Sequence, residues 1–268
     1  MHLVAPQYWG WAPWRVRAYR QAVDLALAIL PFEPVWFARH GVRAAFVGHP
    51  ELDGLGQAPP SSAPERESLV VLPGSRPAVI ERNLGWMLEC ARRLRARRPG
   101  LEVVVAHERV ELRDQLEREL LASGASRWAR LSLGDLQGEL ARARAALSVS
   151  GTILIDLLHQ RLPAAVIYRL RSRAALLASR HLLNVPWFSS VNLLARRPVY
   201  WEACFRGAGP MDGALAYLER AWTEPAFRAE MRGSLDEAAR RLGPPGAVRR
   251  AARHVLLFAA DPPGRPGP

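Results

Sequence analysis

Apolar and polar positions along this chain follow two patterns: short apolar runs, and longer stretches with an apolar residue at every third or fourth position. The short runs predict buried strands, and the longer stretches predict amphipathic helices. At the start of the chain the two patterns alternate, with expected strands at 2–5, 24–30 and 42–47 and expected helices at 15–23 and 32–40. Strands that alternate with helices are typical of a parallel sheet. Because three strands leave both sheet edges open, we expect this domain to begin well before Met1.

The stretch 54–67 has no hydrophobic period and is rich in Pro, Ser, Gly and Ala, so it is interpreted as a linker. A second α/β series follows. Its expected strands are 68–72, 101–106, 128–133, 146–149 and 164–168, and its expected helices are 77–98, 111–123, 134–143, 152–160, 172–183, 211–222, 225–241 and 245–259. The predicted organisation is a partial N-terminal α/β domain (1–53), a linker (54–67), a complete α/β domain (68–260) and a disordered Pro-rich tail (261–268).

Two strand–turn–helix units carry the candidate chemistry. In the first, the apolar run 68–72 ends in Pro73, Gly74, Ser75 and Arg76 before a helix that opens with Pro77. Pro suits the first helical position, and free N–H groups together with the helix dipole make such a turn suitable for a phosphate or diphosphate. A plain strand–helix connection is the alternative, because Gly-Ser turns before helices are common.

The second unit ends in Ser150, Gly151 and Thr152. Both turns are expected at the carboxyl edge of one parallel sheet, which is where open α/β folds bind ligands. Asp156 lies one helical turn beyond Thr152. A carboxylate there can accept the two hydroxyls of a ribose, or it can simply stabilise the N-terminal turn of its helix.

The formal net charge of +12 would ordinarily suggest a nucleic-acid partner. However, all 37 basic residues are Arg, a bias typical of GC-rich coding, and many alternate with acidic residues at helical spacing. No nucleic-acid-binding motif is present, so the charge favours phosphate-bearing partners only weakly. Cys90 and Cys204 are far apart and lack metal-ligand spacing, which predicts reduced, buried thiols. No signal peptide and no apolar run long enough for a spanning helix is present, so we expect a cytoplasmic chain.

The motifs resemble, in order and spacing, those of the lipid-A-disaccharide synthase family, and the resemblance covers residues 2 to about 255. The segments that carry it are 3–11 (LVAPQYWGW), 29–33 (ILPFE), 46–50 (FVGHP), 72–76 (LPGSR), 150–152 (SGT) with Asp156, 165–169 (AVIYR) and 191–195 (VNLLA). Members of this family have two facing Rossmann-like domains, the GT-B arrangement. The resemblance implies transfer of 2,3-diacylglucosamine from its UDP donor to 2,3-diacylglucosamine 1-phosphate, which forms the β-1,6 lipid A disaccharide and releases UDP. It implies no cofactor and no metal.

Matched position by position, the resemblance implies that the UDP diphosphate meets both turns and that Asp156 meets the ribose. The complete set of substrate-binding residues it implies is Gly74, Ser75, Arg76, Ser150, Gly151, Thr152, Asp156, Tyr168, Arg169, Asn192 and Glu202. The chain departs from the family pattern at Val79 (usually acidic), Asp156 (usually Glu), Val191 (usually Pro) and Phe205 (usually Gln).

The family's acceptor region and proposed general base precede the Trp9-Gly10-Trp11 segment, so the base is not assigned. An inverting transfer needs such a base. His49 is the nearby substitute, although a structural role at the end of its strand is the better interpretation. Three alternatives remain. The chain is a synthase whose N-terminal half is missing or supplied by a separate chain, a non-catalytic remnant that still binds a UDP-sugar, or, ranked last, a basic nucleic-acid-binding protein.

Two apolar–basic stretches, 9–20 and 170–183 with the following Pro186, Trp187 and Phe188, are candidates for contact with an anionic membrane surface. Helices that pack between domains with Arg at their rim are the alternative. Because both substrates of the resembled family carry acyl chains, we expect peripheral association with the inner membrane.

Overall fold

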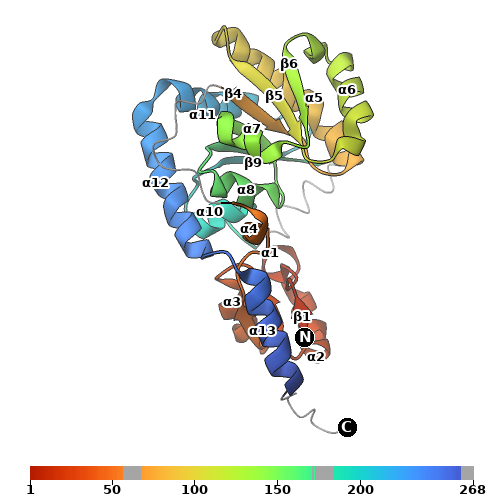
Figure 1. Cartoon of the computed structure of the whole chain (residues 1–268), viewed down its shortest axis with the longest axis vertical. Coiled ribbons are helices and arrows are strands. Elements are labelled where there is room, and N and C mark those ends of the chain that lie inside the picture. The colour runs from red at the N-terminus through yellow and green to blue at the C-terminus, as the bar shows by residue number, and fades with distance from the viewer. Residues whose placement is uncertain (57–67, 171, 173–183, 261–268) are drawn as a thin grey trace. The chain divides into compact units, whose positions relative to one another are not determined.

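The computed structural model describes residues 1–56, 68–170, 172 and 184–260, which form two compact units (Figure 1). Of the described residues, the first unit comprises 1–56, 184–186 and 239–260, and the second comprises 68–170, 172 and 187–238. Most of the expected linker, the expected helix at 172–183 with its apolar–basic stretch, and the tail at 261–268 lie outside the described residues.

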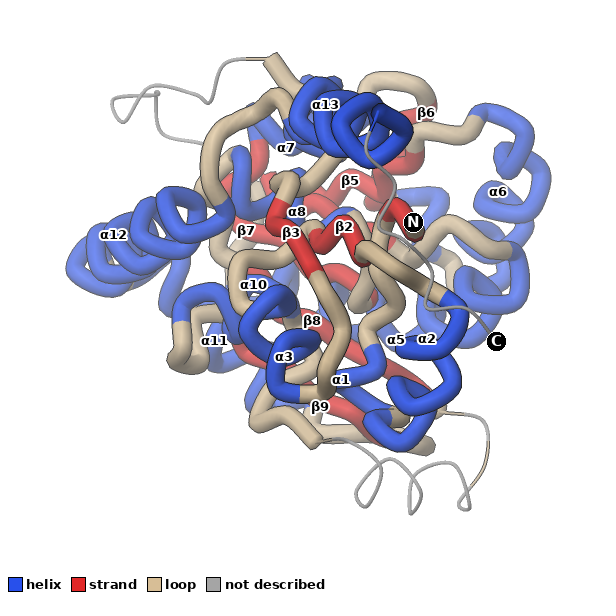
Figure 2. Tube along the Cα trace, turned by 90° about the horizontal axis from the view of Figure 1, so that it is seen from below, coloured by secondary structure: helices blue, strands red, loops and turns tan. Residues whose placement is uncertain are grey.

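The first unit is built on a three-stranded parallel sheet in the order β1-β2-β3. Its strands are β1 (His2–Leu3), β2 (Ala26–Ala28) and β3 (Ala44–Phe46). Its helices are α1 (Tyr8–Trp11), α2 (Val16–Ala22), α3 (Glu33–Arg39), α4 (Glu51–Gly54) and α13 (Ala247–Ala260). Figure 2 shows α13 on one side of β2 and β3, and α1, α2 and α3 on the other.

The alternation of side chains along β2 accounts for these two layers. Ala26 packs with Tyr19 and Phe37, which come from α2 and α3. The next residue, Leu27, packs on the opposite side with Val47 and with Ala251 of α13. The strand is buried on both faces, which explains why its sequence is an uninterrupted apolar run rather than an alternating one.

Glu33 is fully buried in the first unit and is the residue that fixes its Trp-rich segment. Its carboxylate accepts hydrogen bonds from the indole N–H of Trp9 and from the backbone N–H groups of Ile29 and Leu30, each at 2.9 Å. Burial raises the pKa of this carboxyl group, and the three donors oppose the rise. The segments 7–11 and 29–33, far apart in the chain, are therefore joined through one side chain.

The C-terminal helix α13 belongs to the first unit, whereas the sequence interpretation placed all of 68–260 in the second domain. The carboxylate of Asp53 accepts hydrogen bonds from the first N–H groups of α13, those of Gly246, Ala247 and Val248, at 2.5–3.0 Å. Arg250 adds a hydrogen bond from Nε to the carbonyl of Val47 at 2.7 Å. The capping acid and the helix lie 193 residues apart, so no local pattern could reveal this pairing.

The second unit contains a six-stranded, wholly parallel sheet in the order β6-β5-β4-β7-β8-β9. The strands are β4 (Ser68–Leu72), β5 (Glu102–His107), β6 (Ala129–Leu133), β7 (Ala143–Val149), β8 (Ala164–Arg169) and β9 (Trp201–Phe205). The chain moves outward from β4 to β6 and then returns to place β7 on the other side of β4. The carboxyl ends of β4 and β7 therefore form the switch point at which parallel sheets open a crevice.

Helices cover both faces of this sheet, with α5 and α11 packed together on one face and α7 and α8 on the other (Figure 1). The helices are α5 (Pro77–Arg97), α6 (Arg113–Ala122), α7 (Leu136–Arg142), α8 (Ile153–His159), α10 (Ser190–Ala195), α11 (Met211–Thr223) and α12 (Pro225–Leu242), the last of which runs into the first unit. Along α5 the residues Ile80, Leu84, Met87 and Leu94 are fully buried. Each such side chain contributes roughly 1.5–3 kcal/mol, which anchors the turn before the helix.

The sequence analysis did not predict the strand β9 or the short helix α10. β9 forms the edge of the sheet and is only partly buried over most of its length, so it lacks the apolar run that marks the inner strands. For the same reason Cys204 is half-buried rather than buried as expected, whereas Cys90 is buried and burial raises the pKa of its thiol to about 12.

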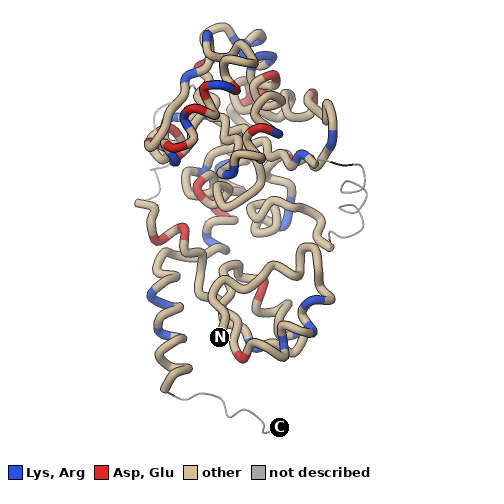
Figure 3. Tube along the Cα trace, turned by 90° about the vertical axis from the view of Figure 1, so that its right-hand side faces the viewer, with Lys and Arg blue, Asp and Glu red and all other residues tan. Residues whose placement is uncertain are grey.

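Basic and acidic positions are interspersed along the second unit (Figure 3). Ion pairs join Arg92 to Glu89 at 2.8 Å and Arg220 to Glu224 at 2.9 Å. This interleaving is the arrangement of a solvated helix surface and not of a continuous basic stripe for nucleic acid.

Candidate functional site

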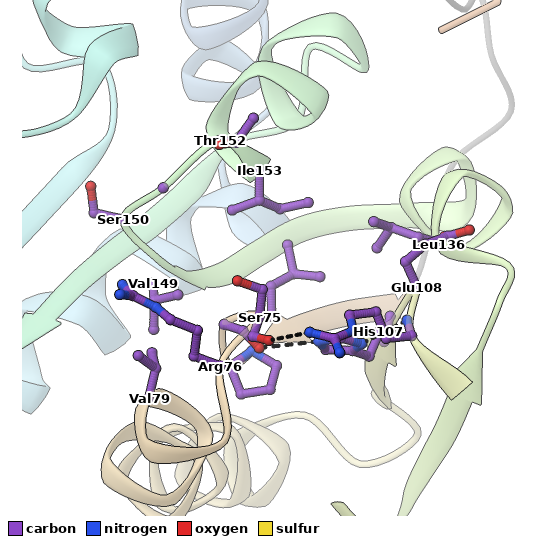
Figure 4. A pocket seen from close by; sticks show the side chains of 16 residues that line it. Ser75, Arg76, Val79, His107, Glu108, Leu136, Val149, Ser150, Thr152 and Ile153 are labelled. Carbon is purple, nitrogen blue, oxygen red and sulfur yellow. Dashed lines mark hydrogen bonds between the residues drawn. The ribbon is translucent and has the colours of Figure 1, made fainter. Parts of the chain in front are cut away.

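A cavity of about 480 Å³ lies at the carboxyl ends of β4, β5 and β7 (Figure 4). Three connections meet around it: the turn 73–76 after β4, the loop 107–109 after β5 and the turn 150–152 after β7. Leu136, Val149 and Ile153 supply apolar lining. The two turns that the sequence singled out are therefore brought together at one site.

The first turn needs a glycine at position 74. Gly74 has φ +108°, a conformation that side chains with a Cβ rarely adopt. A Cβ there would lie 2.6 Å from Cγ1 of Val79 and 3.1 Å from Cγ2 of Val149. The turn leads directly into α5, whose 21 residues direct the positive end of a long helix dipole at the exposed Ser75 and Arg76.

The second turn closes the opposite side of the cavity. The backbone N–H of Ser150 donates to the carbonyl of Ile167 at 3.1 Å, which ties the turn to the neighbouring strand β8. Figure 4 shows Ser150 and Thr152 across the cavity from Ser75 and Arg76. Two hydroxyl-bearing turns and one guanidinium facing a shared space form a set of donors suited to an anionic ligand.

The sequence analysis did not identify the third connection, the loop after β5, as part of the site. It brings His107, Glu108 and Arg109 to the cavity. The signal was present, because the apolar run 101–106 predicts a strand whose carboxyl end reaches the same sheet edge. His107 is buried, and burial is the main cause that lowers its pKa. A neutral imidazole follows at physiological pH.

The whole chain was compared with known proteins. A family model described as lipid-A-disaccharide synthetase matches residues 1–210. The lipid-A-disaccharide synthase of Myxococcus xanthus (strain DK1622) is 35% identical over 98% of this chain and 70% of that protein. The enzyme of the same name from Rhodospirillum centenum is 34% identical over 96% of this chain and 66% of that protein. This chain belongs to the lipid-A-disaccharide synthase family.

Membership confirms the recognised resemblance and the expected enzyme class, a hexosyltransferase. The chain spans about two thirds of the length of these synthases.

Among solved structures, S. aureus MnaA with UDP matches with a TM-score of 0.59 at 14% identity, over 94% of this chain and 66% of that one. The pneumococcal O-GlcNAc transferase GtfA with UDP and GlcNAc matches with a TM-score of 0.54 at 14% identity, over 91% and 47%. These likenesses confirm the α/β, Rossmann-like GT-B fold class.

Five of the residues implied by the family resemblance lie outside the cavity lining. Asp156 is one of them. It is buried on α8, and its Oδ1 accepts a hydrogen bond from Nε2 of Gln137 at 2.6 Å. This hydrogen bond joins its carboxylate to α7, and Asp156 does not line the cavity between the two turns.

Asn192 and Glu202 form a closed polar network in this synthase homologue. The amide oxygen of Asn192 accepts from the N–H groups of Val199 (2.9 Å) and Tyr200 (2.7 Å), and its Nδ2 donates to the carbonyl of Tyr200 and to Glu202. The Glu202 carboxylate also accepts from the N–H groups of Phe188 and Ser189. Burial raises the pKa of Glu202, and these donors oppose the rise. The pair fastens the 188–200 segment to the edge of the sheet.

Tyr168 and Arg169 end β8, and neither side chain lines the cavity between the two turns. The Tyr168 ring is half-exposed and lies 6.3 Å from the ring of Phe188. Arg169 donates to the carbonyl of Arg82 and lines a separate cavity with Trp86 and the 207–213 loop. Burial, followed by the nearby charge of Arg82, lowers its pKa.

In the described ranges, no cluster of three His, Cys, Asp or Glu side chains is arranged to hold a metal ion. Nor does any helix within these ranges combine the length and the apolarity needed to cross a membrane.

Proposed function

We propose that this chain carries the donor-binding part of a lipid A glycosyltransferase, with the cavity at the β4–β7 switch point holding the UDP of the sugar donor. The reaction proposed is transfer of 2,3-diacylglucosamine from UDP to 2,3-diacylglucosamine 1-phosphate, giving the β-1,6 disaccharide and UDP. The observation that carries it is the convergence of the Gly74-Ser75-Arg76 turn, at the start of a 21-residue helix, with Ser150, Gly151 and Thr152.

The chemistry of transfer explains the choice of ligand. Negative charge develops on the departing diphosphate as the sugar–oxygen bond breaks, and preorganised donors lower the free energy of that transition state. Arg76, the N–H groups at the start of α5 and the hydroxyls of Ser75, Ser150 and Thr152 are the groups available for this in the cavity. They replace water around the charge without having to reorganise.

The general base stays unassigned among the described residues. His49 follows β3 in the first unit, and its Nδ1 accepts a hydrogen bond from the N–H of Glu51 at 3.3 Å. Burial lowers its pKa. This contact favours the structural interpretation, in which His49 organises the start of α4, and we propose that the acceptor-side base comes from residues beyond this chain.

UDP titration by calorimetry tests the donor site. We expect binding by the purified chain and a loss of about 1.5–3 kcal/mol in Arg76→Ala, because one charge-assisted phosphate contact is removed. Arg118→Ala is the matched control, since Arg118 is an exposed Arg on α6 of the same unit. Absence of UDP binding by the unaltered chain would refute the donor site and leave a decayed remnant.

A transfer assay with both acylated substrates separates an enzyme from a remnant that still binds UDP-sugar. Activity of the chain alone would establish a complete catalyst. Activity that arises only when an N-terminal half is added would establish a split synthase, and UDP binding without any activity in either form would establish the remnant.

We also propose that the first unit contacts the inner membrane at its cytoplasmic surface. Its Trp11 and Trp14 side chains are 50% and 58% exposed, and Leu3 is 52% exposed. Exposed Arg15 and Arg17 accompany them. Aromatic side chains beside Arg are suited to the headgroup region of an anionic bilayer.

Sedimentation with vesicles tests this surface. We expect binding to phosphatidylglycerol-containing vesicles and a clear loss in the double variant Trp11→Ser with Trp14→Ser. Leu121→Ser, at a position 72% exposed on the second unit, is the control and should bind as the unaltered chain does. Equal sedimentation of all three proteins would count against the proposed membrane surface.

A further inference from the structure

Side chains from the loop after β5 and from the first turn of α6 hold three of the four carbonyl groups of residues 74–77. The Nε2 of His107 donates to the carbonyl of Gly74 at 3.2 Å, and Nη1 of Arg109 donates to the carbonyl of Ser75 at 3.4 Å. The Nε2 of Gln115 donates to the carbonyl of Pro77 at 2.8 Å. Figure 4 shows the imidazole of His107 beside the first turn.

This bracing determines where the amide groups of the turn point. A trans peptide is planar, so its C=O and N–H point in opposite directions, and the described residues contain no cis peptide. The Gly74 carbonyl faces the β5 side, so the N–H of Ser75 faces the other side. Because β4 lies between β5 and β7, that other side is where Ser150, Gly151 and Thr152 lie.

The same reasoning applies to the next peptide, which joins Ser75 to Arg76. In the described part of the chain, neither the Ser75 amide nor the Arg76 amide donates to another backbone group. Two adjacent N–H groups at the start of α5 are thus directed toward the second turn, with a carbonyl brace behind them. This is the orientation that an anion between the two turns requires.

His107 is the member of the brace whose own position is fixed. Its Nδ1 accepts the backbone N–H of Arg109 at 2.8 Å, so the proton of the neutral ring lies on Nε2, the atom that reaches Gly74. The side chain is 7% exposed. In contrast, Arg109 and Gln115 form exposed contacts.

We propose that His107 is a positioning residue of the donor site: through its hydrogen bond to Gly74 it orients the Ser75 and Arg76 amides toward the diphosphate. This inference rests on the proposed function, because it assigns His107 a task at the same cavity. His107 does not touch the ligand in this role. It acts through the turn that does.

Three substitutions separate the two hydrogen bonds of the ring. Gln at position 107 places an amide N–H near the position of Nε2 and can still reach Gly74, whereas Asn places an oxygen near Nδ1 and can only receive the Arg109 N–H. Ala removes both. We expect UDP affinity to fall about tenfold in His107→Ala, which corresponds to the loss of one buried hydrogen bond, and to stay low in His107→Asn. His107→Gln should recover affinity to within about threefold of the unaltered chain.

The pH profile is a second readout. The charged groups that share the cavity with His107 are Arg76 from the first turn and Glu108 and Arg109 from its own loop, while the second turn and α7 contribute uncharged lining. Protonation would set an Nδ1–H against the Arg109 N–H and break the bond that fixes the ring. Because the native pKa is lowered, we expect UDP affinity to drop as pH falls below about 6.5. The drop should be smaller in His107→Gln. Any titration of UDP itself affects both proteins equally, so the difference between their pH profiles reports on His107.

The outcomes are distinguishable. If the unaltered chain fails to bind UDP, the proposed function fails and takes this inference with it. If the chain binds UDP but all three variants bind equally well, or if Asn rescues and Gln does not, His107 is not a positioning residue while the donor site stands. Equal losses of thermal stability with unchanged affinity would likewise overturn the inference, because a merely structural role moves only the melting temperature.

Discussion

Two regions of the second unit were assigned the same task from the sequence, yet the structure gives them opposite characters. At the Gly74-Ser75-Arg76 turn the carbonyls are held from behind, and the exposed side chains face a cavity of about 480 Å³. In the Asn192–Glu202 network the side-chain oxygens and nitrogens are engaged with backbone groups or with each other. Polar groups whose hydrogen bonds are already used hold the fold together. Polar groups with capacity left over at a cavity are the ones available to a ligand.

The largest effect that this comparison predicts is on stability. Asn192→Ala removes the acceptor of the Tyr200 N–H, one of the two acceptors of the Val199 N–H, and the amide donor to the Tyr200 carbonyl and the Glu202 carboxylate. We expect the free energy of unfolding to fall by about 3–4 kcal/mol, because each buried polar group left unpaired costs about 1–3 kcal/mol. Urea unfolding measures the loss. A variant of unchanged stability that no longer binds UDP would break the comparison by showing Asn192 to be a ligand contact.

The next effect should combine stability with binding. Gly74→Ala puts a Cβ at φ +108° and 2.6 Å from Val79, so we expect a cost of about 1–3 kcal/mol in stability. UDP affinity should fall with it, because the turn must shift. The second turn offers the control for stability: a Cβ at Gly151 meets no protein atom within 4 Å, so Gly151→Ala should leave thermal unfolding nearly unchanged. Similar results for the two glycines would mean that the first turn tolerates distortion.

Two serines on one strand end sharpen the comparison further. Ser150 lines the cavity, whereas Ser148 is fully buried and donates to the carbonyl of Val149 at 2.9 Å. We expect Ser150→Ala to weaken UDP binding by about 0.5–1.5 kcal/mol with no change in unfolding. Ser148→Ala should leave UDP affinity unchanged. The reverse pattern in calorimetry would place the ligand elsewhere.

The same contrast explains how far the sequence could lead. The inner strands and their two turns were predictable, because β4, β7 and β8 each contain a buried apolar run (69–72, 145–147 and 164–167) and their carboxyl ends share one sheet edge. The edge strand β9 was not, since Trp201–Phe205 is partly exposed and mixed in character. The placement of α13 in the first unit depends on a carboxylate 193 residues away.

The candidate site residues also fall into two groups, those that line the cavity and those whose hydrogen bonds are used within the fold. Motif matching found the residues that line the cavity from two turns, but it could not tell them from Asn192, Glu202 and Asp156, which are engaged elsewhere. It also missed His107, because the family resemblance gave that position no role. Whether a polar side chain has hydrogen-bonding capacity left for a ligand depends on its neighbours in space, and a motif does not record them.

Asp156 should have the smallest effect on UDP binding, and its test discriminates best between the two regions. Its carboxylate accepts from Gln137 and is buried against α7, so the structure groups it with the closed network despite its position one turn after Thr152. We expect Asp156→Asn to lower stability by about 1 kcal/mol, because a charge-assisted hydrogen bond becomes a neutral one. The ratio of UDP to 2′-deoxy-UDP affinity, measured by calorimetry, should be the same in the variant and in the unaltered chain. If the carboxylate instead turned to accept the ribose hydroxyls on binding, the ratio would fall toward one in the variant. Asp156 would then be a ligand contact, like the residues of the Gly74-Ser75-Arg76 turn, and not a structural residue like Asn192 and Glu202.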